Sequence, residues 1–321
     1  MEGLKDFPPS RLKKNPASDV LSIAMTYLSD LLLPDIRPLS ETTAVAVGGV
    51  GGSGTRVMAR VLQKIGFDMG SDLNDSLDDL CFTALFKRPA LWPLGQHTSD
   101  LVAALEIYLT GRGVVTPQTT SLVQHQERTQ QLLKEIGGEI AWLEKGSLAD
   151  RAAHLSSIGG AAEVWGWKEP NTHVVLPFLL AALPNLTYIH VIRHGVDMAF
   201  SSNQTQVQLW GQAFGNSSLE DDPYHRSVSY WCCTHRRMVE LSRLHPGRIY
   251  LLRLESLFES QGDLAKSLSE FLNRPELATH LEQALSEIER PTTLGRHKTK
   301  ETLCLSQENR ATLESLGYSY P

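Results

Sequence analysis

The sequence predicts an α/β fold, a parallel sheet flanked by helices, in a single domain over 1–321. Short apolar segments rich in β-branched residues at 43–48, 186–192 and 248–254 indicate buried strands, and helical patterns separate them. Strands that alternate with helices favour parallel pairing through crossover connections. Since no linker or internal repeat interrupts the chain, we predict one domain that carries a helical insertion over about 75–160.

The first half of the chain supplies one strand and several helices. Helical periodicity over 19–33 precedes the strand at 43–48, and a second helical pattern follows over 55–66. The insertion contains three predicted helices with one polar face, at 99–110, 121–137 and 147–158. These helices carry no recognisable motif.

The second half alternates strand and helix more regularly. A short strand is predicted at 163–167 and a helix at 171–183. The strand at 186–192 is the clearest in the sequence, because it is β-branched and aromatic and ends at a charged residue. A long helix over 222–245 and a strand at 248–254 follow, and the remainder is mostly helical.

Composition excludes several classes of function. A net charge of −6 and a pI near 6.0 argue against nucleic acid and anionic membranes as partners. The longest apolar run, 174–184, is too short for a membrane span, and the N-terminus lacks the apolar stretch of a signal peptide. The four cysteines lack metal-ligand spacing, so we expect reduced thiols, no metal site and a soluble cytoplasmic protein: Cys81, Cys232, Cys233 and Cys304.

A glycine-rich turn at 48–56 joins the first strand to the following helix. Such turns commonly hold a phosphate-like anion on backbone N–H groups and the helix N-terminus. A nucleoside triphosphatase loop would need lysine and then a hydroxyl after the last glycine, where this chain has Thr55 and Arg56. It would also need an acid for magnesium on a neighbouring strand, and the strand at 186–192 ends in Arg193 instead.

Two other interpretations of the turn stay open at this point. Gly49, Gly51 and Gly54 match the GxGxxG spacing of NAD-dependent oxidoreductases, which also need a second strand that ends in an acid. Asp68 and Asp72 lie near the required distance, but the segment around them is a poor strand. A purely structural glycine turn is the other alternative.

The spelling VGGVGGSGTRVMARVL resembles the 5′-phosphosulfate loop of the sulfotransferases. Backbone N–H groups and two hydroxyls suit a phosphate bridged to a sulfate. The resemblance implies a cofactor-binding loop made by Gly51, Gly52, Ser53, Gly54, Thr55 and Arg56.

A second motif, VIRHGVDMAFSSN, resembles the element that holds the 3′-phosphate in the same family. The resemblance implies that Arg193 and Ser201 bind this phosphate and that Asp197 braces the turn. A salt bridge between Arg193 and Asp197 at the surface is the simpler alternative. Two such motifs in the right order, each after a strand, are harder to obtain by chance than one.

The C-terminal third adds two further similarities, at 248–259 and 293–321. In relatives the basic loop closes over the nucleotide, which implies Arg296 and, less directly, Lys298 as ligands. The resemblance spans 43–72 and 163–321. It implies a P-loop-like core, the donor 3′-phosphoadenosine 5′-phosphosulfate (PAPS), the product adenosine 3′,5′-bisphosphate (PAP) and sulfuryl transfer to a hydroxyl or amine.

One departure from the family bears on catalysis. Relatives usually carry lysine or arginine where this chain has Gly52, so another cation must reach the leaving oxygen. Lys168, just past a strand, is the candidate, and Arg56 is a second one. The alternatives are that Lys168 is an exposed turn lysine, or that the protein binds the nucleotide bisphosphate without catalysis.

For the base that accepts the acceptor's proton, the resemblance implies Asp72, two residues past Gly70. The alternative is that the whole acidic run is a solvated loop. The insertion is expected to form a lid over the acceptor site, and the acceptor to be a small molecule, a sugar or a lipid headgroup. The sequence predicts no oligomeric state.

Overall fold

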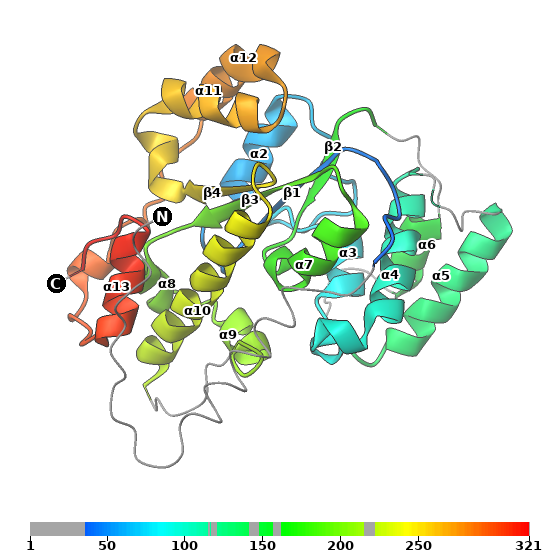
Figure 1. Cartoon of the computed structure of the whole chain (residues 1–321), viewed down its shortest axis with the longest axis horizontal. Coiled ribbons are helices and arrows are strands. Elements are labelled where there is room, and N and C mark those ends of the chain that lie inside the picture. The colour runs from blue at the N-terminus through cyan, green and yellow to red at the C-terminus, as the bar shows by residue number, and fades with distance from the viewer. Residues whose placement is uncertain are drawn as a thin grey trace.

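The computed structural model describes residues 36–114, 116, 121–140, 148–156, 162–214 and 222–320. The predicted helix over 19–33 lies outside these residues. Four parallel strands form one sheet in the order β2-β1-β3-β4 (Figure 1). Their bounds are β1 Ala44–Gly49, β2 Trp165–Lys168, β3 Leu186–Ile192 and β4 Ile249–Arg253. The predicted α/β fold is therefore confirmed.

Helices connect and cover these strands (Figure 1). The first six in the described part of the chain are α2 Thr55–Lys64, α3 Leu80–Phe86, α4 Thr98–Gly111, α5 Leu122–Ile136, α6 Leu148–Ser156 and α7 Thr172–Ala182. The next six are α8 Gly195–Ala199, α9 Thr205–Trp210, α10 Pro223–Leu244, α11 Gln261–Phe271, α12 Ala278–Ser286 and α13 Gln307–Ser315. The predicted helices in the described residues are present, with ends that differ by a few residues.

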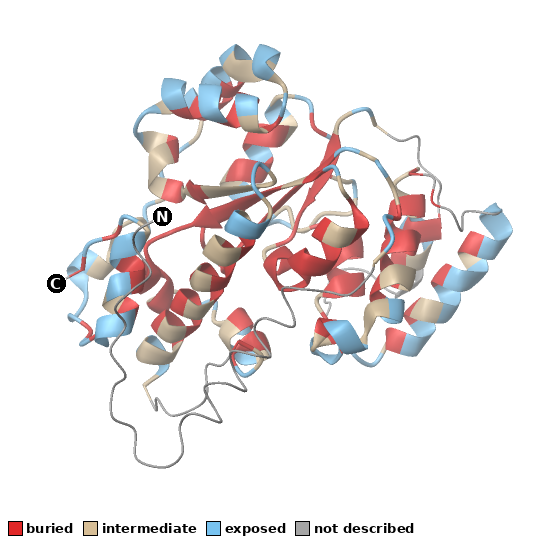
Figure 2. Cartoon of the chain, in the orientation of Figure 1, coloured by how far each residue is buried: buried red, intermediate tan, exposed pale blue. Residues whose placement is uncertain are grey.

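The two faces of the sheet bury different core clusters, because side chains alternate along a strand. In β1, Ala44 and Ala46 pack on the side of α7 and α10, whereas Val45 and Val47 pack on the side of α2, α11 and α12. All six residues of β1 are buried, and the sheet forms the buried centre of the molecule (Figure 2). This layered packing holds the carboxyl ends of the strands rigidly.

Helices α3 to α6 pack beyond the β2 edge of the sheet (Figure 1). Aromatic rings join them to β2, since the Phe82 ring stacks on Trp167 with centroids 5.0 Å apart and Tyr108 meets Trp167 edge-on. Trp165 and Trp167 are buried, so they serve the core. The segment predicted as an insertion is thus anchored on the strand that ends in Lys168.

The C-terminus packs back onto the end of β3. Tyr318 donates from its hydroxyl to the carbonyl oxygen of Ile192 and to Glu255, at 3.2 and 2.8 Å. Helix α13 lies against α10. In the ranges that the structure describes, no helix combines the length and the apolar character that crossing a bilayer requires.

Candidate functional site

Three adjacent parallel strands end at the same edge of the sheet, and each end carries a residue singled out by the sequence. Pairing sets Val47 beside Lys168 and Gly49 beside Val191, so Lys168 and Arg193 flank the glycine loop. The strand order changes direction at β1, which is where open α/β sheets bind ligands.

A cavity of about 260 Å³ lies at this edge. Residues from all three strand ends and from later loops line it: Gly51, Gly52, Gly54, Thr55, Arg56, Val57, Ser76, Asp78, Lys168, Pro170, Arg193, Asn203, Leu254, Pro291 and Thr293. The cavity therefore brings together the glycine loop, the predicted cation Lys168 and Arg193, the arginine predicted to bind a phosphate.

The glycine loop needs its glycines for conformation and space. Gly52 and Gly54 have φ of 87° and 96°, in the left-handed region that side chains disfavour. A Cβ on Gly54 would also lie 2.5 Å from Leu254. Helix α2 begins at Thr55 directly after this turn, so its first N–H groups lack partners within the helix and can donate to an anion.

One predicted loop residue does not face the cavity. Five of the six line it, whereas the Ser53 side chain is fully buried beneath the loop, close to Gly49. The Ser53 hydroxyl has no hydrogen-bond partner among the described residues, and its N–H donates to Val50 at 3.0 Å. Ser53 thus shapes the turn in this structure.

Lys168 is buried and lines the cavity. Only 2% of its surface is exposed, so the alternative of an exposed turn lysine is wrong. Its Nζ forms an ion pair with Asp78 and donates to the carbonyl oxygen of Ser76 at 2.9 Å. Both partners come from one loop, residues 73–79.

Asn74 organises the loop 73–79. Its side-chain oxygen accepts from the N–H groups of Ser76 and Asp78, and its amide nitrogen donates to the Asp78 carboxylate, each at 2.9 Å. Leu77 has φ of 61°, an uncommon conformation for a bulky side chain. The loop therefore presents Asp78 to Lys168 in a defined position.

Asp72, the predicted base, lies apart from Lys168. It forms an ion pair with Arg151 and lines a second cavity of about 170 Å³ between the core, α4 and α6. Asp79 lines that second cavity too, and burial raises the pKa of its carboxyl group despite hydrogen bonds from Phe82 and Tyr108. The consecutive residues Asp78 and Asp79 thus line two different cavities.

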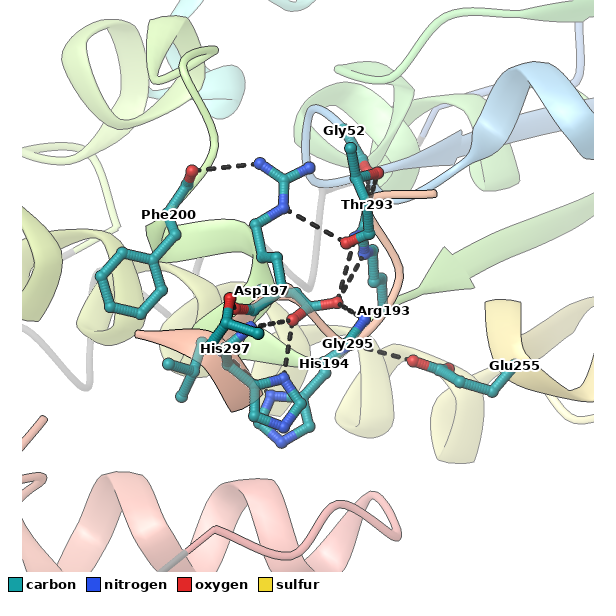
Figure 3. A network of polar contacts seen from close by, with 12 residues as sticks. Gly52, Arg193, His194, Asp197, Phe200, Glu255, Thr293, Gly295 and His297 are labelled. Carbon is teal, nitrogen blue, oxygen red and sulfur yellow. Dashed lines mark hydrogen bonds and ion pairs between the residues drawn. The ribbon is translucent and has the colours of Figure 1, made fainter. Parts of the chain in front are cut away.

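Arg193 is buried in a network that joins three segments (Figure 3). Its guanidinium donates to Asp197 at 3.0 and 3.2 Å, to the Thr293 hydroxyl at 3.2 Å and carbonyl, and to the Gly52 carbonyl at 3.4 Å. The salt bridge to Asp197 is present, but it is buried and lies against the glycine loop, unlike the surface pair that was the simpler alternative.

Asp197 clamps the basic loop that follows Thr293. Its carboxylate accepts from the N–H groups of Gly295 and His297 and from the His297 ring, at 2.6, 2.9 and 2.6 Å (Figure 3). Burial alone would raise the pKa of Asp197, but these hydrogen bonds together with Arg193 hold it well below its ordinary value. Asp197 is therefore a carboxylate at neutral pH.

Arg296 and Ser201 lie beside this network. Arg296 donates to the carbonyl oxygen of Phe200 at 3.0 Å, and both burial and the nearby Arg193 lower its pKa. An anion between the two guanidinium groups would relieve their repulsion. The Ser201 hydroxyl lies 3.4 Å from where a Cβ on Gly52 would be, so it touches the glycine loop.

The topology argues against the dinucleotide alternative. In that fold the strand after the first helix lies next to the first strand. Here the segment after α2 makes one bridge, Asp68 to Trp165, and so lies beside β2 instead of β1. The loop matches the GxGxxG sequence pattern, but the strands around it are not arranged as in a dinucleotide-binding fold.

Asp78 and Thr293 are among the cavity-lining residues that the sequence analysis did not select. Asp78 lies in the acidic run that drew attention to Asp72, and only the Asn74 hydrogen bonds select it. An Asn four residues before an Asp, in a segment that could be a loop, was a signal that could have found it. Nothing local in the sequence marks Thr293, because its role depends on a tertiary contact.

Comparisons with known proteins give the family of the chain. The model of the sulfotransferase family matches residues 44–278, more than half of the chain. A search of curated proteins finds no match.

Among solved structures, the sulfotransferase domain of the Synechococcus PCC 7002 olefin synthase is 15% identical with a TM-score of 0.45, over 90% of this chain and 99% of that domain. The sulfotransferase domain of the curacin biosynthetic pathway is 15% identical, with a TM-score of 0.46, over 87% and 99%. Sulfotransferase STF9 of Mycobacterium avium is 14% identical, with a TM-score of 0.41, over 94% and 82%. From its family match, the chain belongs to the sulfotransferase family.

Proposed function

We propose that the protein transfers a sulfuryl group from PAPS to a hydroxyl or amine of an acceptor. The observation that carries the proposal is the convergence of the glycine loop, Lys168 and Arg193 on one cavity at the edge of the sheet. Each supplies a different interaction that a phosphosulfate nucleotide needs.

The residues present fit such a nucleotide. The N–H groups at the start of α2 and the Thr55 hydroxyl suit the 5′-phosphosulfate, because they donate hydrogen bonds without a bulky side chain in the way. Beside Gly52, the guanidinium groups of Arg193 and Arg296 and the hydroxyl of Ser201 suit the 3′-phosphate. Arg56 lines the cavity at the rim.

Lys168 takes the place of the cation that the loop lacks. The leaving oxygen of PAPS gains charge as the sulfur–oxygen bond breaks, and a buried ammonium group stabilises that charge more strongly than an exposed one. Lys168 is buried and lines the same cavity as Gly52, where relatives carry a cation. Its long side chain can reach an oxygen above the loop.

The acceptor is proposed to be a small molecule, a sugar or a lipid headgroup that enters beside α3 to α6. These helices stand on β2 next to Lys168, and helical additions beside a constant cofactor core commonly set substrate choice. The chain's net charge of −6 does not favour a polyanionic acceptor.

Turnover of PAPS by wild type and Lys168→Met tests this proposal. Conversion of PAPS to PAP would be measured by chromatography with a mixture of phenol, sugar, alcohol and amine acceptors. We expect Lys168→Met to lower turnover by about 10²- to 10³-fold with a much smaller loss of PAP affinity, because the ammonium group acts mainly on developing charge.

Lys64→Met is the matched control, since Lys64 pairs with Glu287 on the surface and should leave turnover unchanged. Equal losses of turnover and affinity in Lys168→Met would make Lys168 a binding residue only. PAP binding without turnover of PAPS by the wild type would instead favour a nucleotide-binding protein that lacks catalysis.

A further inference from the structure

The ammonium group of Lys168 is held by the loop 73–79, which contributes Ser76 and Asp78 to the lining of the cavity. The ammonium group contacts the Asp78 carboxylate and the Ser76 carbonyl oxygen, which both belong to this loop. Asp78 and Lys168 both line the cavity beneath the glycine loop. The ammonium group of Lys168, which we propose stabilises the leaving oxygen, is therefore paired in this structure with the carboxylate of Asp78, a residue that lines the same cavity.

We propose that Asp78 is the base that accepts the acceptor's proton, and that its ion pair with Lys168 opens only when the donor binds. This inference rests on the proposed function. The 5′-phosphosulfate group carries two negative charges, so it should attract the ammonium group more strongly than one carboxylate does. Lys168 then turns toward the leaving oxygen, and Asp78 is left free at the acceptor.

The proposed step balances as an in-line displacement. The acceptor oxygen or nitrogen forms a bond to sulfur while the bond from sulfur to the 5′-phosphate oxygen breaks. The electron pair of that bond stays on the phosphate oxygen, beside the Lys168 ammonium group. The acceptor's proton passes to the Asp78 carboxylate, which later releases it to water. No oxidant, reductant or metal enters this balance.

Neighbouring carboxyl groups are committed elsewhere. Asp72 is paired with Arg151 at the second cavity, and Asp79 accepts from Phe82 and Tyr108. Glu169 follows Lys168 directly, but it is buried and bound to the backbone and side chain of Asn171. Among these four acids, Asp78 is the one that lines the cavity of the glycine loop.

The loop also explains why Asp78 stays in place when Lys168 leaves. Asn74 donates to the Asp78 carboxylate and accepts from the Asp78 N–H, both at 2.9 Å. These bonds do not involve Lys168. A carboxylate held by its own loop remains oriented after the ion pair opens.

The test measures PAP affinity by calorimetry and PAPS turnover for Asp78→Asn, at constant ionic strength. PAP carries the oxygen that Lys168 must reach, so removing the competing carboxylate should tighten PAP binding by about tenfold. The same variant should lose about 10²- to 10⁴-fold in turnover, because it has no base. Opposite effects on affinity and turnover are the signature of the proposal.

Two comparisons isolate the ion pair. In the Lys168→Met background, Asp78→Asn should change PAP affinity by much less than in the wild type, since there is no ammonium group to release. Asp72→Asn, an acid of the same run at the other cavity, should leave both quantities near the wild-type values. Asp78→Ser, checked by circular dichroism, replaces Asp78→Asn if that variant does not fold.

The outcomes distinguish a failure of the inference about Asp78 from a failure of the proposed function. Unchanged or weaker PAP binding by a folded Asp78 variant, or full turnover without this carboxylate, overturns the inference and leaves the proposed function standing. A larger loss of turnover in Asp72→Asn than in Asp78→Asn also overturns it. A wild-type protein that does not bind PAP contradicts the proposed function instead.

Discussion

Single residues at the glycine loop explain how this chain departs from the pattern of its family. Gly52 has φ of 87°, and a Cβ there would lie 3.3 Å from the Met198 side chain and 3.4 Å from Ser201. A long cationic side chain at this position would be strained and crowded. The loop therefore disfavours a lysine or arginine at position 52, but it is compatible with a cation supplied by Lys168 of β2.

Arg193 has structural contacts in addition to its proposed role in binding, so its substitution should affect both stability and affinity. Arg193→Lys keeps the charge but loses the planar fork that contacts Asp197, Thr293 and Gly52. We expect PAP affinity to fall by about 10- to 100-fold and the free energy of unfolding by about 1–2 kcal/mol. Calorimetry and denaturant unfolding measure the two effects.

The control for this variant is Arg243→Lys, because Arg243 is exposed near the end of α10 and pairs with Glu240 on the surface. It should change neither quantity. PAP affinity that survives Arg193→Lys would show that Arg193 only braces the turn.

Also at the residue scale, the sequence was a better guide to which residues lie at the sheet edge than to which side chains contact each other. Lys168 and Arg193 were identified because they follow strands, and parallel strands end at one edge. The choice of Asp72 over Asp78 rested on distance along the chain, whereas the geometry depends on hydrogen bonds by Asn74. Side-chain direction within an acidic run is not encoded by spacing alone.

At the scale of elements, the loop at 291–297 covers one side of the site. The segment from Pro291 to His297 lies over the cavity because Asp197 accepts two backbone N–H groups and a ring N–H from it. A buried carboxylate with several donors is costly to neutralise, because the donors then lose their partner. The basic loop is thus tied to the turn after β3.

Asp197→Asn tests this clamp. We expect a loss of about 3 kcal/mol in the free energy of unfolding, because Arg193 keeps a buried charge without its partner. Hydrogen exchange should speed up at 291–299, and PAP should dissociate faster. Asp263→Asn, an exposed acid in the first turn of α11, is the control. Unchanged exchange at 291–299 would contradict the clamp.

Strands and helices could be predicted from the sequence where apolar residues follow one clear pattern. The strand at 186–192 was predicted with the bounds that the structure shows, because its residues are β-branched and buried on both faces. The strand predicted at 163–167 lies at Trp165–Lys168 instead, since tryptophan and glycine give little periodicity and pairing with β1 decides the register. Lys168 is therefore part of the strand.

The whole molecule buries several histidines in the core between α7, β3 and α10. Burial lowers the pKa of His173 to about 3 and that of His235 to about 4, and lowers the pKa of His190 as well. Their rings lie 5.1 to 5.9 Å apart, measured between centroids. They stay neutral in the folded protein at a pH where an unfolded chain would bind protons.

Stability should therefore fall as the pH falls from about 6.5 toward 4. In that window the unfolded state binds more protons than the folded state, so protonation favours unfolding. Glu169 acts in the opposite sense, because burial raises its pKa to about 7 and the folded state then binds the extra proton. Asp79 acts in the same sense as Glu169, since burial raises its pKa too, whereas burial lowers the pKa of His194 to about 4 and adds a fourth imidazole to the three in the core. We expect the four imidazoles to outweigh the two carboxyl groups.

We expect denaturant unfolding to show a loss on the order of 3 kcal/mol between pH 7 and pH 5. His235→Gln should reduce this pH dependence, whereas His280→Gln, on the surface of α12, should not. Constant stability across the window would contradict buried neutral imidazoles.

The central claim, at the scale of the whole molecule, is that this sheet edge binds a nucleotide with 5′- and 3′-phosphates. A calorimetric titration of the wild-type protein with PAP, with NAD and ATP as controls, tests it most directly. The account predicts a dissociation constant on the order of micromolar for PAP and no comparable affinity for NAD or ATP. No binding of PAP, or a preference for NAD, would contradict it.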